Sequence, residues 1–378
     1  MKISVLQENL AHGLSVVSRA VSPRSTLPVL SNILVATDDG RLRLSATNLE
    51  LGITCWIGAK VEEEGSTTVP ARTFTDLVST IPPAKTDMTY HESNQSLNIN
   101  SGALNTDIKC IDAQEFPPMP VPDLDSGVEI NVTDFKNMIK QVVFAASHDE
   151  ARPILTGVLI TVEDNTITLA AADGFRLSVR TAELSNSVPS PLKAVIPARA
   201  LSELARVSSD GEEVITMLIP ENRGQVIFRT KNVELISQLI EGTFPDYQQI
   251  IPKSHQTRTI LSTPAFLKAC KQAEVFAREG SLIAQVNIKP SPEENTPGEV
   301  EISGQSEETG SSQSVLDATT EGDGLVIAFN VRYLREVLEV IQTPNVALET
   351  TKPTSPGVIR PVGDEHFLHV IMPMHLGN

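Results

Sequence analysis

The chain has 378 residues, of which 40% are hydrophobic, and a formal net charge of −17. This length suits two or three domains, and no stretch approaches the roughly 18 apolar residues that cross a membrane as a helix. The first residues alternate like a strand and lack the apolar centre of a signal peptide, so we expect a cytoplasmic protein with no membrane association. The acidic balance by itself argues against binding nucleic acid or anionic membranes, although net charge does not say where the basic side chains lie.

Three cysteines, Cys55, Cys110 and Cys270, lie far apart and form no Cys-x-x-Cys pair. This spacing argues against a disulfide framework or a zinc site and fits a reducing compartment. We therefore expect each cysteine to be a small buried hydrophobe, and we expect no metal or other cofactor.

The predicted elements begin with a short strand and a helical stretch, "LQENLAHGLSVVSRAV". Two alternating strands follow in "NILVATDDGRLRLSAT", where Asp39-Gly40 is a hairpin signal. Residues 67–81, "TTVPARTFTDLVSTI", then pass from a β-branched run through Pro and Arg into helical spacing. The segment "QEFPPMP" (114–120) ends this first set of elements.

The same set appears twice more along the chain. The first helical stretch returns as "TDFKNMIKQVVFAAS" and "TPAFLKACKQAEVFARE", in which Thr133 and Thr263 are the predicted N-caps. The hairpin returns with Asp164-Asn165 at its turn, and in the third copy the turn has grown into a Pro- and Glu-rich loop. The passage from strand into helix returns at 193–207 and 325–341.

A proline recurs at the end of each copy, at Pro117, Pro245 and Pro373, with 128 positions between successive prolines. Three unrelated domains would not explain this identical spacing, so internal repetition sets the fold class. We predict an α+β protein of three tandem, structurally similar domains, each with two helices and antiparallel sheets. The predicted domains are 1–122, 128–251 and 253–378.

Open sheet edges at the two ends of such a chain would invite pairing with another chain. One closed solution is head-to-tail association, in which the first domain of one copy meets the third domain of another and forms a ring.

Basic residues are relatively enriched in the predicted helices and their entry loops. These six segments hold 13 Lys or Arg and 10 Asp or Glu, whereas the rest of the chain holds 17 and 37. The segregation is compatible with ordinary solvated helix faces, and also with a helix-lined surface that tolerates a phosphate backbone.

Residues 171–179, "AADGFRLSV", contain an Asp173-Gly174 turn signal that fits either a plain hairpin or the rim of a site. Together with "STLPVLSNILV" after Arg24, "VPAR", "EGTFPDY", "FNVRYL" and the terminal "VIMPMHL", this stretch resembles the bacterial DNA sliding clamp, the beta subunit of DNA polymerase III. Each motif alone is weak, but the set covers the whole chain in the right order and is highly specific.

The resemblance implies a processivity factor of DNA replication with no catalysis of its own. It implies a head-to-tail homodimer ring around double-stranded DNA, held topologically and without sequence specificity. An ATP-driven clamp loader would open the ring, which would tether the catalytic subunit of the replicative polymerase.

The resemblance also implies a hydrophobic groove between the second and third domains, where other polymerases and repair proteins insert short Leu- and Phe-containing peptides. Carried over by motif, the predicted groove residues are Leu155, Ala172, Gly174, Phe175, Arg176, Leu177, Pro245, Ile250, Val370, Met372, Pro373, Met374 and Leu376. Methionine suits such a role because it is flexible and polarisable. The alternative is that Met372 and Met374 only complete the core of the third domain.

Three positions depart from the pattern of the family, which often has His at Phe175, Thr at Ala172 and a basic residue at His375. These changes make the predicted groove more apolar and less charged. The tail also continues through Gly377 and Asn378, which would crowd one subsite of the groove.

The resemblance places Arg24 against DNA, with Arg72, Arg152 and Arg199 as further DNA-facing candidates, although each could be a plain surface charge. For the dimer interface, it predicts that Val275 and Phe276 of one chain face Thr106 and Ile108 of another.

Two other classes of protein are alternatives to the clamp. An enzyme is disfavoured because GxxxxGK, GxGxxG, HExxH and GxSxG are absent and the seven histidines show no ligand spacing. A repeat scaffold that binds peptides without encircling DNA predicts the same groove but no closed ring.

Overall fold

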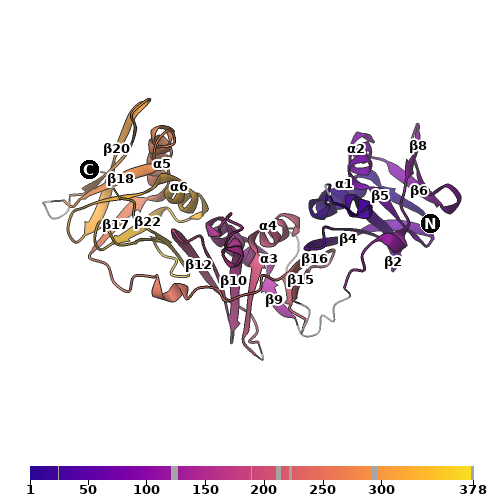
Figure 1. The fold of residues 1–378 in the computed structure, drawn as a ribbon, viewed down its shortest axis with the longest axis horizontal. Coiled ribbons are helices and arrows are strands. Elements are labelled where there is room, and N and C mark those ends of the chain that lie inside the picture. The colour runs from indigo at the N-terminus through magenta and orange to yellow at the C-terminus, as the bar shows by residue number, and fades with distance from the viewer. Residues whose placement is uncertain are drawn as a thin grey trace. The chain divides into compact units, whose positions relative to one another are not determined.

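The computed structural model describes residues 1–23, 25–120, 127–188, 190–209, 214–220, 224–291 and 296–375. The chain packs as two compact units, Met1–Thr133 with Arg199–Leu239, and Asp134–Ala198 with Ile240–Asn378. Each unit is built on one antiparallel sheet of twelve described strands (Figure 1). The central part of the chain therefore contributes to both sheets.

The sheet of the first unit has the strand order β8-β7-β6-β1-β4-β16-β15-β14-β9, and β2, β3 and β5 branch from this path through the β3–β4 pair. Its strands are β1 (Lys2–Leu6), β2 (Asn32–Asp38), β3 (Arg41–Thr47), β4 (Leu51–Glu63), β5 (Ser66–Pro70), β6 (Lys85–His91), β7 (Ser96–Ser101), β8 (Leu104–Lys109), β9 (Val128–Asn131), β14 (Val214–Leu218), β15 (Gln225–Arg229) and β16 (Val233–Gln238).

The sheet of the second unit has the strand order β13-β10-β11-β12-β24-β23-β22-β17-β20-β19-β18-β21. Its strands are β10 (Gly157–Glu163), β11 (Thr166–Ala172), β12 (Arg176–Glu183), β13 (Leu192–Pro197), β17 (Thr257–Ser262), β18 (Ile283–Lys289), β19 (Gly298–Ser306), β20 (Gly310–Glu321), β21 (Leu325–Asn330), β22 (Asn345–Thr350), β23 (Gly357–Pro361) and β24 (Phe367–Ile371).

Six α-helices occur in the described residues, two in each of the three sequence repeats. They are α1 (Gln7–Val17), α2 (Ala71–Thr80), α3 (Val132–Val142), α4 (Ala198–Val207), α5 (Thr263–Ala277) and α6 (Val331–Val340). In the second unit α5 and α6 lie side by side and α5 packs on β19 and β20 (Figure 1). The predicted pattern of two helices and antiparallel strands per repeat is confirmed.

The residues at which two helices begin correct one detail of the prediction. α3 begins at Val132 and α5 at Thr263, so Thr133 and Thr263 lie inside their helices rather than at the N-cap. The reason at α5 is that β17 runs directly into the helix with no loop, which makes Ser262 the flanking residue and places Pro264 in the first turn.

Local turn chemistry fixes the hairpins as expected. Asp39 and Gly40 have φ of +48° and +70°, and they join β2 to β3 in the register Asp38↔Arg41. Two consecutive positive φ angles define the turn that follows the right-handed twist of a hairpin, which is why Asp-Gly is favoured there. Asp164 adopts a φ of +52° in the equivalent turn between β10 and β11.

The apolar face of each helix covers the core beneath it. In α6 the side chains of Leu334, Val337 and Leu338 are fully buried in one cluster with Phe266 of α5 and Phe329 of β21. This is the helical spacing predicted from residues 325–341. Cys55, Cys110 and Cys270 are all buried, as expected.

Strand pairing, in addition to the connectors, joins the sheet of one sequence repeat to that of the next. β16 pairs with β4 in the first unit, and β24 pairs with β12 in the second. The sheet is therefore continuous across each junction between repeats, and this continuity positions the groove described next.

Candidate functional site: an apolar groove beside the turn 173–176

An apolar cluster lies where β12 meets β24. Its buried members include Leu155, Ala172, Leu177 and Val370, which are four of the predicted groove residues. Leu177 and Val370 face each other in the β12–β24 register. The structure therefore brings together residues from η7 (Pro153–Thr156), β11, β12 and β24 that are up to 215 positions apart in the sequence.

The turn between β11 and β12 is held by the Asp173 side chain. Its Oδ1 accepts hydrogen bonds from the backbone N–H groups of Phe175 (2.8 Å) and Arg176 (3.0 Å). Gly174 has a φ of +95°, a conformation that favours glycine. The turn is thus a hairpin turn by geometry, and its apex presents Phe175 to solvent with 58% of the residue exposed.

The tail of the chain runs beside this turn. The backbone N–H of Met372 donates to the carbonyl oxygen of Phe175 at 2.8 Å, which extends the β12–β24 ladder by one bond. Met374 is tied in turn to the carbonyl of Ala328 at 2.8 Å. Met372 is 39% exposed, while Pro373 and Met374 are half-buried. These two methionines therefore do not simply complete the buried core.

The connector after β16 supplies the remaining predicted residues. Phe244 is buried in the apolar cluster, whereas Pro245 and Ile250 are exposed, Ile250 by 41%. Tyr247 and Ile251 are half-buried and pack against the same cluster. Leu376 and the Gly377-Asn378 extension lie outside the described residues.

Arg176 occupies a different environment from the one predicted for it. Its side chain is 6% exposed and makes ion pairs with Asp173 (3.0 Å) and with Glu336 of α6. It also donates to the carbonyl of Phe144 at 2.6 Å and lies 4.2 Å from the ring centroid of Tyr333. A guanidinium with these partners holds the turn in place and presents little surface to a ligand.

A buried histidine lies beneath the same turn. His369 is fully buried, its Nδ1 lies 2.6 Å from the Ser178 hydroxyl, and its ring stacks at a tilt on Phe144. Burial, and secondarily the positive charge of Arg176, hold the pKa of His369 well below its usual value. The ring is therefore neutral at pH 7, and it packs in the interior as an uncharged polar side chain.

The sequence did not indicate the residues that surround Arg176 beneath the turn. Phe144, Tyr333, Glu336 and His369 reach Arg176 from three separate elements, and no local motif links them. The one available signal was the helical spacing of Tyr333 and Glu336, which places both on one side of α6.

Arg152 lies at the groove rather than on a free helix face. Its Nη2 donates to the carbonyl of Asp173 at 3.4 Å, and its Nε is 3.8 Å from the Asp149 carboxylate. Among the other DNA-facing candidates, Arg72 in α2 has a 95% exposed side chain and Arg199 in α4 is also exposed. Arg24 lies outside the described residues.

Many helix cations are neutralised by neighbouring carboxylates. Arg335 of α6 pairs with Glu274 of α5 at 2.7 Å and with Glu339 at 2.9 Å, and Lys271 pairs with Glu339 at 3.0 Å. In the first unit Arg19 pairs with Glu203 at 3.0 Å. The helix surfaces therefore carry fewer available cations than the sequence count indicates.

Two of the predicted interface residues lie on an edge strand and two on a helix. Thr106 and Ile108 are on β8, the terminal strand of the first sheet, with Thr106 half-buried and Ile108 buried. Val275 is 55% exposed on α5, beside the half-buried Phe276. β20 pairs with β19 from Gly310 to Ala318 but with β17 only from Thr319, so no described strand covers the other edge of its first half.

Within the described part of the chain, the acidic, His and Cys side chains and the helices bear on two other kinds of site. No group of three or more His, Cys, Asp or Glu side chains is placed to hold a metal ion. No helix in this part is long and apolar enough to cross a membrane.

Repeated α+β domains joined through continuous antiparallel sheets, with an apolar groove at the second junction, define a DNA clamp. Models of the DNA polymerase III beta subunit match the chain over residues 1–120 (N-terminal domain), 129–246 (central domain) and 248–375 (C-terminal domain). The chain belongs to this family, the non-catalytic sliding clamps that act as processivity factors of DNA replication.

Individual relatives agree with this assignment. The chain is 32% identical over 386 residues to the beta sliding clamp of Bacillus subtilis (strain 168), with 99% of each chain covered. It is 32% identical to the beta sliding clamp of Synechococcus elongatus, with 100% of each covered. The crystal structure of the DNA polymerase sliding clamp from Bacillus subtilis superposes with a TM-score of 0.93 over 100% of both chains at 30% identity.

Proposed function

We propose that two copies of this chain form a head-to-tail ring around double-stranded DNA and tether the catalytic subunit of the replicative polymerase through the groove. The observation that carries the proposal is the exposure of Phe175, Ile250 and Met372 beside a buried apolar cluster. Neighbouring apolar side chains in water favour a partner that covers them. The proposed domain ranges remain 1–122, 128–251 and 253–378.

The groove suits a short peptide with Leu and Phe anchors. Burying one such anchor contributes roughly 1.5–3 kcal/mol, so two anchors give useful affinity without a large interface. The flexible Met372 and Met374 side chains adapt to different peptides. The same groove would therefore serve the clamp loader, other polymerases and repair proteins in turn.

Two unpaired strand edges support ring closure. The outer edge of β8 in one copy and the open edge of Gly310–Ala318 in another would pair and continue the sheet from one copy to the next. The exposed Val275 and half-buried Phe276 of α5 would then cover the apolar side of β8 near Ile108. Because the two surfaces differ, the contact is head-to-tail, and two such contacts close a ring.

A ring holds DNA by topology and needs few phosphate contacts. Arg72 and Arg199, with Arg24, are the proposed contacts. The pair of Arg72 with Asp76, at 3.7 Å, is almost fully exposed and easily replaced by a phosphate, whereas the shorter and less exposed pairs of Arg335 make that cation less available. This arrangement reconciles DNA binding with a net charge of −17, because affinity that does not rest on many phosphate contacts permits sliding.

The test is a titration of the full chain with a fluorescent peptide that carries Leu and Phe anchors, followed by anisotropy. The double variant Met372→Ala/Met374→Ala should bind at least about tenfold more weakly, or about 1.4 kcal/mol. The matched control is Leu27→Ala, which truncates a comparably exposed apolar residue in the other unit. Equal binding by the double variant and the control would overturn the groove assignment.

A further inference from the structure

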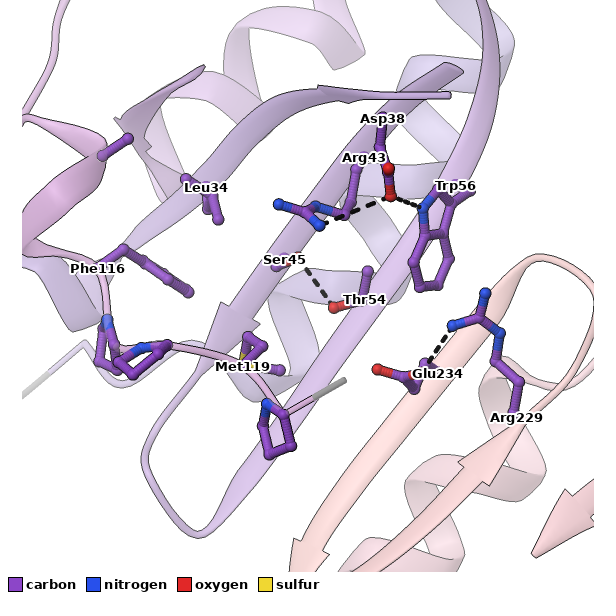
Figure 2. A pocket seen from close by; sticks show the side chains of 14 residues that line it. Leu34, Asp38, Arg43, Ser45, Thr54, Trp56, Phe116, Met119, Arg229 and Glu234 are labelled. Atoms are coloured by element: carbon purple, nitrogen blue, oxygen red, sulfur yellow. Dashed lines mark hydrogen bonds and ion pairs between the residues drawn. The ribbon is translucent and has the colours of Figure 1, made fainter. Parts of the chain in front are cut away.

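A hollow of about 420 Å³ lies in the first unit, over β3, β4 and β16 and under the connector 113–120 (Figure 2). Its size falls in the range of small-molecule sites. All of its lining residues belong to the first unit, so it is separate from the groove beside Phe175.

The floor of this hollow is polar where the matching place in the second unit is apolar. Ser45 and Thr54 face each other on β3 and β4, two residue pairs away from the Thr47–Gly52 pair that closes the hairpin. The matching pair on β11 and β12 is Ala170 and Val179, both buried in the apolar cluster. The first junction therefore has hydroxyl groups at positions where the second has core.

The neighbouring strand shows the same replacement. Thr54 is opposite Glu234 of β16, whereas Val179 is opposite Leu368 of β24. Burying a carboxylate costs free energy, so a buried carboxylate normally has an ionic or hydrogen-bonding partner. Glu234 accepts from Arg229 Nη1 at 2.6 Å, although burial still raises the pKa of this carboxyl.

The two carboxylates that line the hollow, Asp38 and Glu234, already accept hydrogen bonds from other side chains. Asp38 Oδ2 accepts the indole N–H of Trp56 at 2.7 Å, and the Arg229 guanidinium that binds Glu234 also lies 4.0 Å from the Trp56 ring centroid. These contacts fix the indole at one end of the hollow (Figure 2).

Arg43 is the group with spare donors. Its one ion pair among the described residues is with Asp38, at 3.6 Å, and its charge also acts on Glu234; its Nε is buried with no hydrogen-bond partner among these residues. In Figure 2 its guanidinium extends over the floor toward Phe116. The Arg43 side chain is 37% exposed, so the rest of its guanidinium stays accessible to an acceptor from a ligand.

The floor offers one more donor. The hydroxyl oxygens of Ser45 and Thr54 are 2.9 Å apart, and only one of them can donate to the other. The second hydroxyl proton is therefore available to a bound oxygen atom. A planar acceptor with two oxygens matches the fork of an arginine, which is the geometry of a carboxylate.

The opposite wall is apolar and comes from the connector. Phe116 and Met119 pack in a small cluster with Leu30 and Leu34, and Met119 also contacts the cluster of Ile227 and Ile236. This wall would cover the apolar body of a ligand whose charged end lies at Arg43.

We propose that this hollow binds a small carboxylate with an apolar or aromatic body, held by Arg43 and the Ser45–Thr54 hydroxyls and covered by Phe116 and Met119. The source of such a group is either a free organic acid or the C-terminal residue of a peptide. Both present a carboxylate next to an apolar side chain.

Trp56 allows a direct test, because it is the single tryptophan of the chain and lines the hollow. The probe is N-acetyl-L-phenylalanine, added to the full chain while Trp56 emission is followed. Its uncharged amide is the matched ligand. We expect a saturable change with the acid and at least tenfold weaker binding of the amide. An acetylated tetrapeptide ending in Phe, with a free carboxylate, separates the two sources: the tighter of the two acids identifies the kind of ligand.

Arg43→Met should weaken binding of the acid at least tenfold. Arg41→Met is the control, because Arg41 is on the same strand two residues away and also near Trp56, at 5.9 Å, but does not line the hollow. A second variant, Ser45→Ala/Thr54→Val, copies the apolar floor of the second unit and should also lose the acid while the chain stays folded by circular dichroism. No saturable change up to millimolar acid, equal binding of acid and amide, or undiminished binding by both variants would each overturn the proposal.

Discussion

Arg176 of β12 and Glu336 of α6 form a partly buried ion pair that ties the turn of one sequence repeat to a helix of the next. The guanidinium is 6% exposed and is shared with Asp173 and the carbonyl of Phe144. The ion pairs of Arg176 therefore hold the turn 173–176 in place, while the apex of this turn carries the apolar side chain of Phe175. Arg176 makes the turn rigid, and the adjacent Phe175 gives it an exposed apolar surface.

Replacement of Arg176 by Met should destabilise the protein by about 3 kcal/mol. It leaves the Asp173 carboxylate with backbone donors alone and Glu336 with only the longer pair to Arg335 at 3.6 Å. Glu336→Gln keeps a hydrogen-bond acceptor and should cost less, about 1 kcal/mol. Urea unfolding of the three proteins measures both. A cost of Arg176→Met no larger than that of Glu336→Gln would show that the guanidinium does not hold the turn.

Because His369 is buried, we expect the free energy of unfolding to depend on pH. Its folded pKa is held below that of the unfolded chain, so the unfolded chain binds more protons between the two values. Its contribution is complete above about pH 6.5 and is lost as pH falls, by up to about 1.4 kcal/mol per pH unit.

The measurement compares urea midpoints at pH 7.5 and pH 5.5 for the wild type, His369→Gln and His366→Gln. His369→Gln should show the smaller loss on acidification, whereas the exposed His366 three residues earlier serves as the control. An identical pH dependence in the wild type and His369→Gln would assign the acid sensitivity to other groups.

Val275 tests the proposed interface. A charge at this exposed position should weaken self-association at least tenfold, because Val275→Asp would bury an unpaired carboxylate when a second copy docks. Sedimentation velocity measures the dimer fraction. Val214→Asp makes the same change at another valine that is 42% exposed and should leave the dimer intact. Equal effects of the two changes would argue against α5 as the contact.

The helix cations predict a shallow salt dependence of DNA binding. Arg72→Gln should reduce the slope of log affinity against log salt by about one, because it removes one phosphate contact. Arg335→Gln should leave the slope unchanged, since Arg335 is held by Glu274 and Glu339. Anisotropy of a labelled duplex between low and moderate salt measures both slopes, and the reverse ranking would contradict the assignment.

The repeated architecture could be predicted from sequence because its signals are local. Asp39-Gly40 specifies a turn by the φ angles of two adjacent residues, and the spacing of Leu334, Val337 and Leu338 specifies one face of a single helix. The family motifs likewise marked four of the ten buried members of the apolar cluster, among them Leu177 and Val370, which each occur in a recognisable stretch. These features depend on neighbours in the chain.

Only the tertiary structure decided what the polar residues do. Arg176 looked like a groove residue and Arg152 like a DNA contact, but one is buried beneath the turn and the other lies against it. The hollow around Arg43 depends on the pairing of β4 with β16, which brings Glu234 opposite Thr54 across 180 positions of sequence. A charged side chain takes its role from the partners that folding brings to it, and strand pairing between distant segments leaves no periodic trace in the sequence.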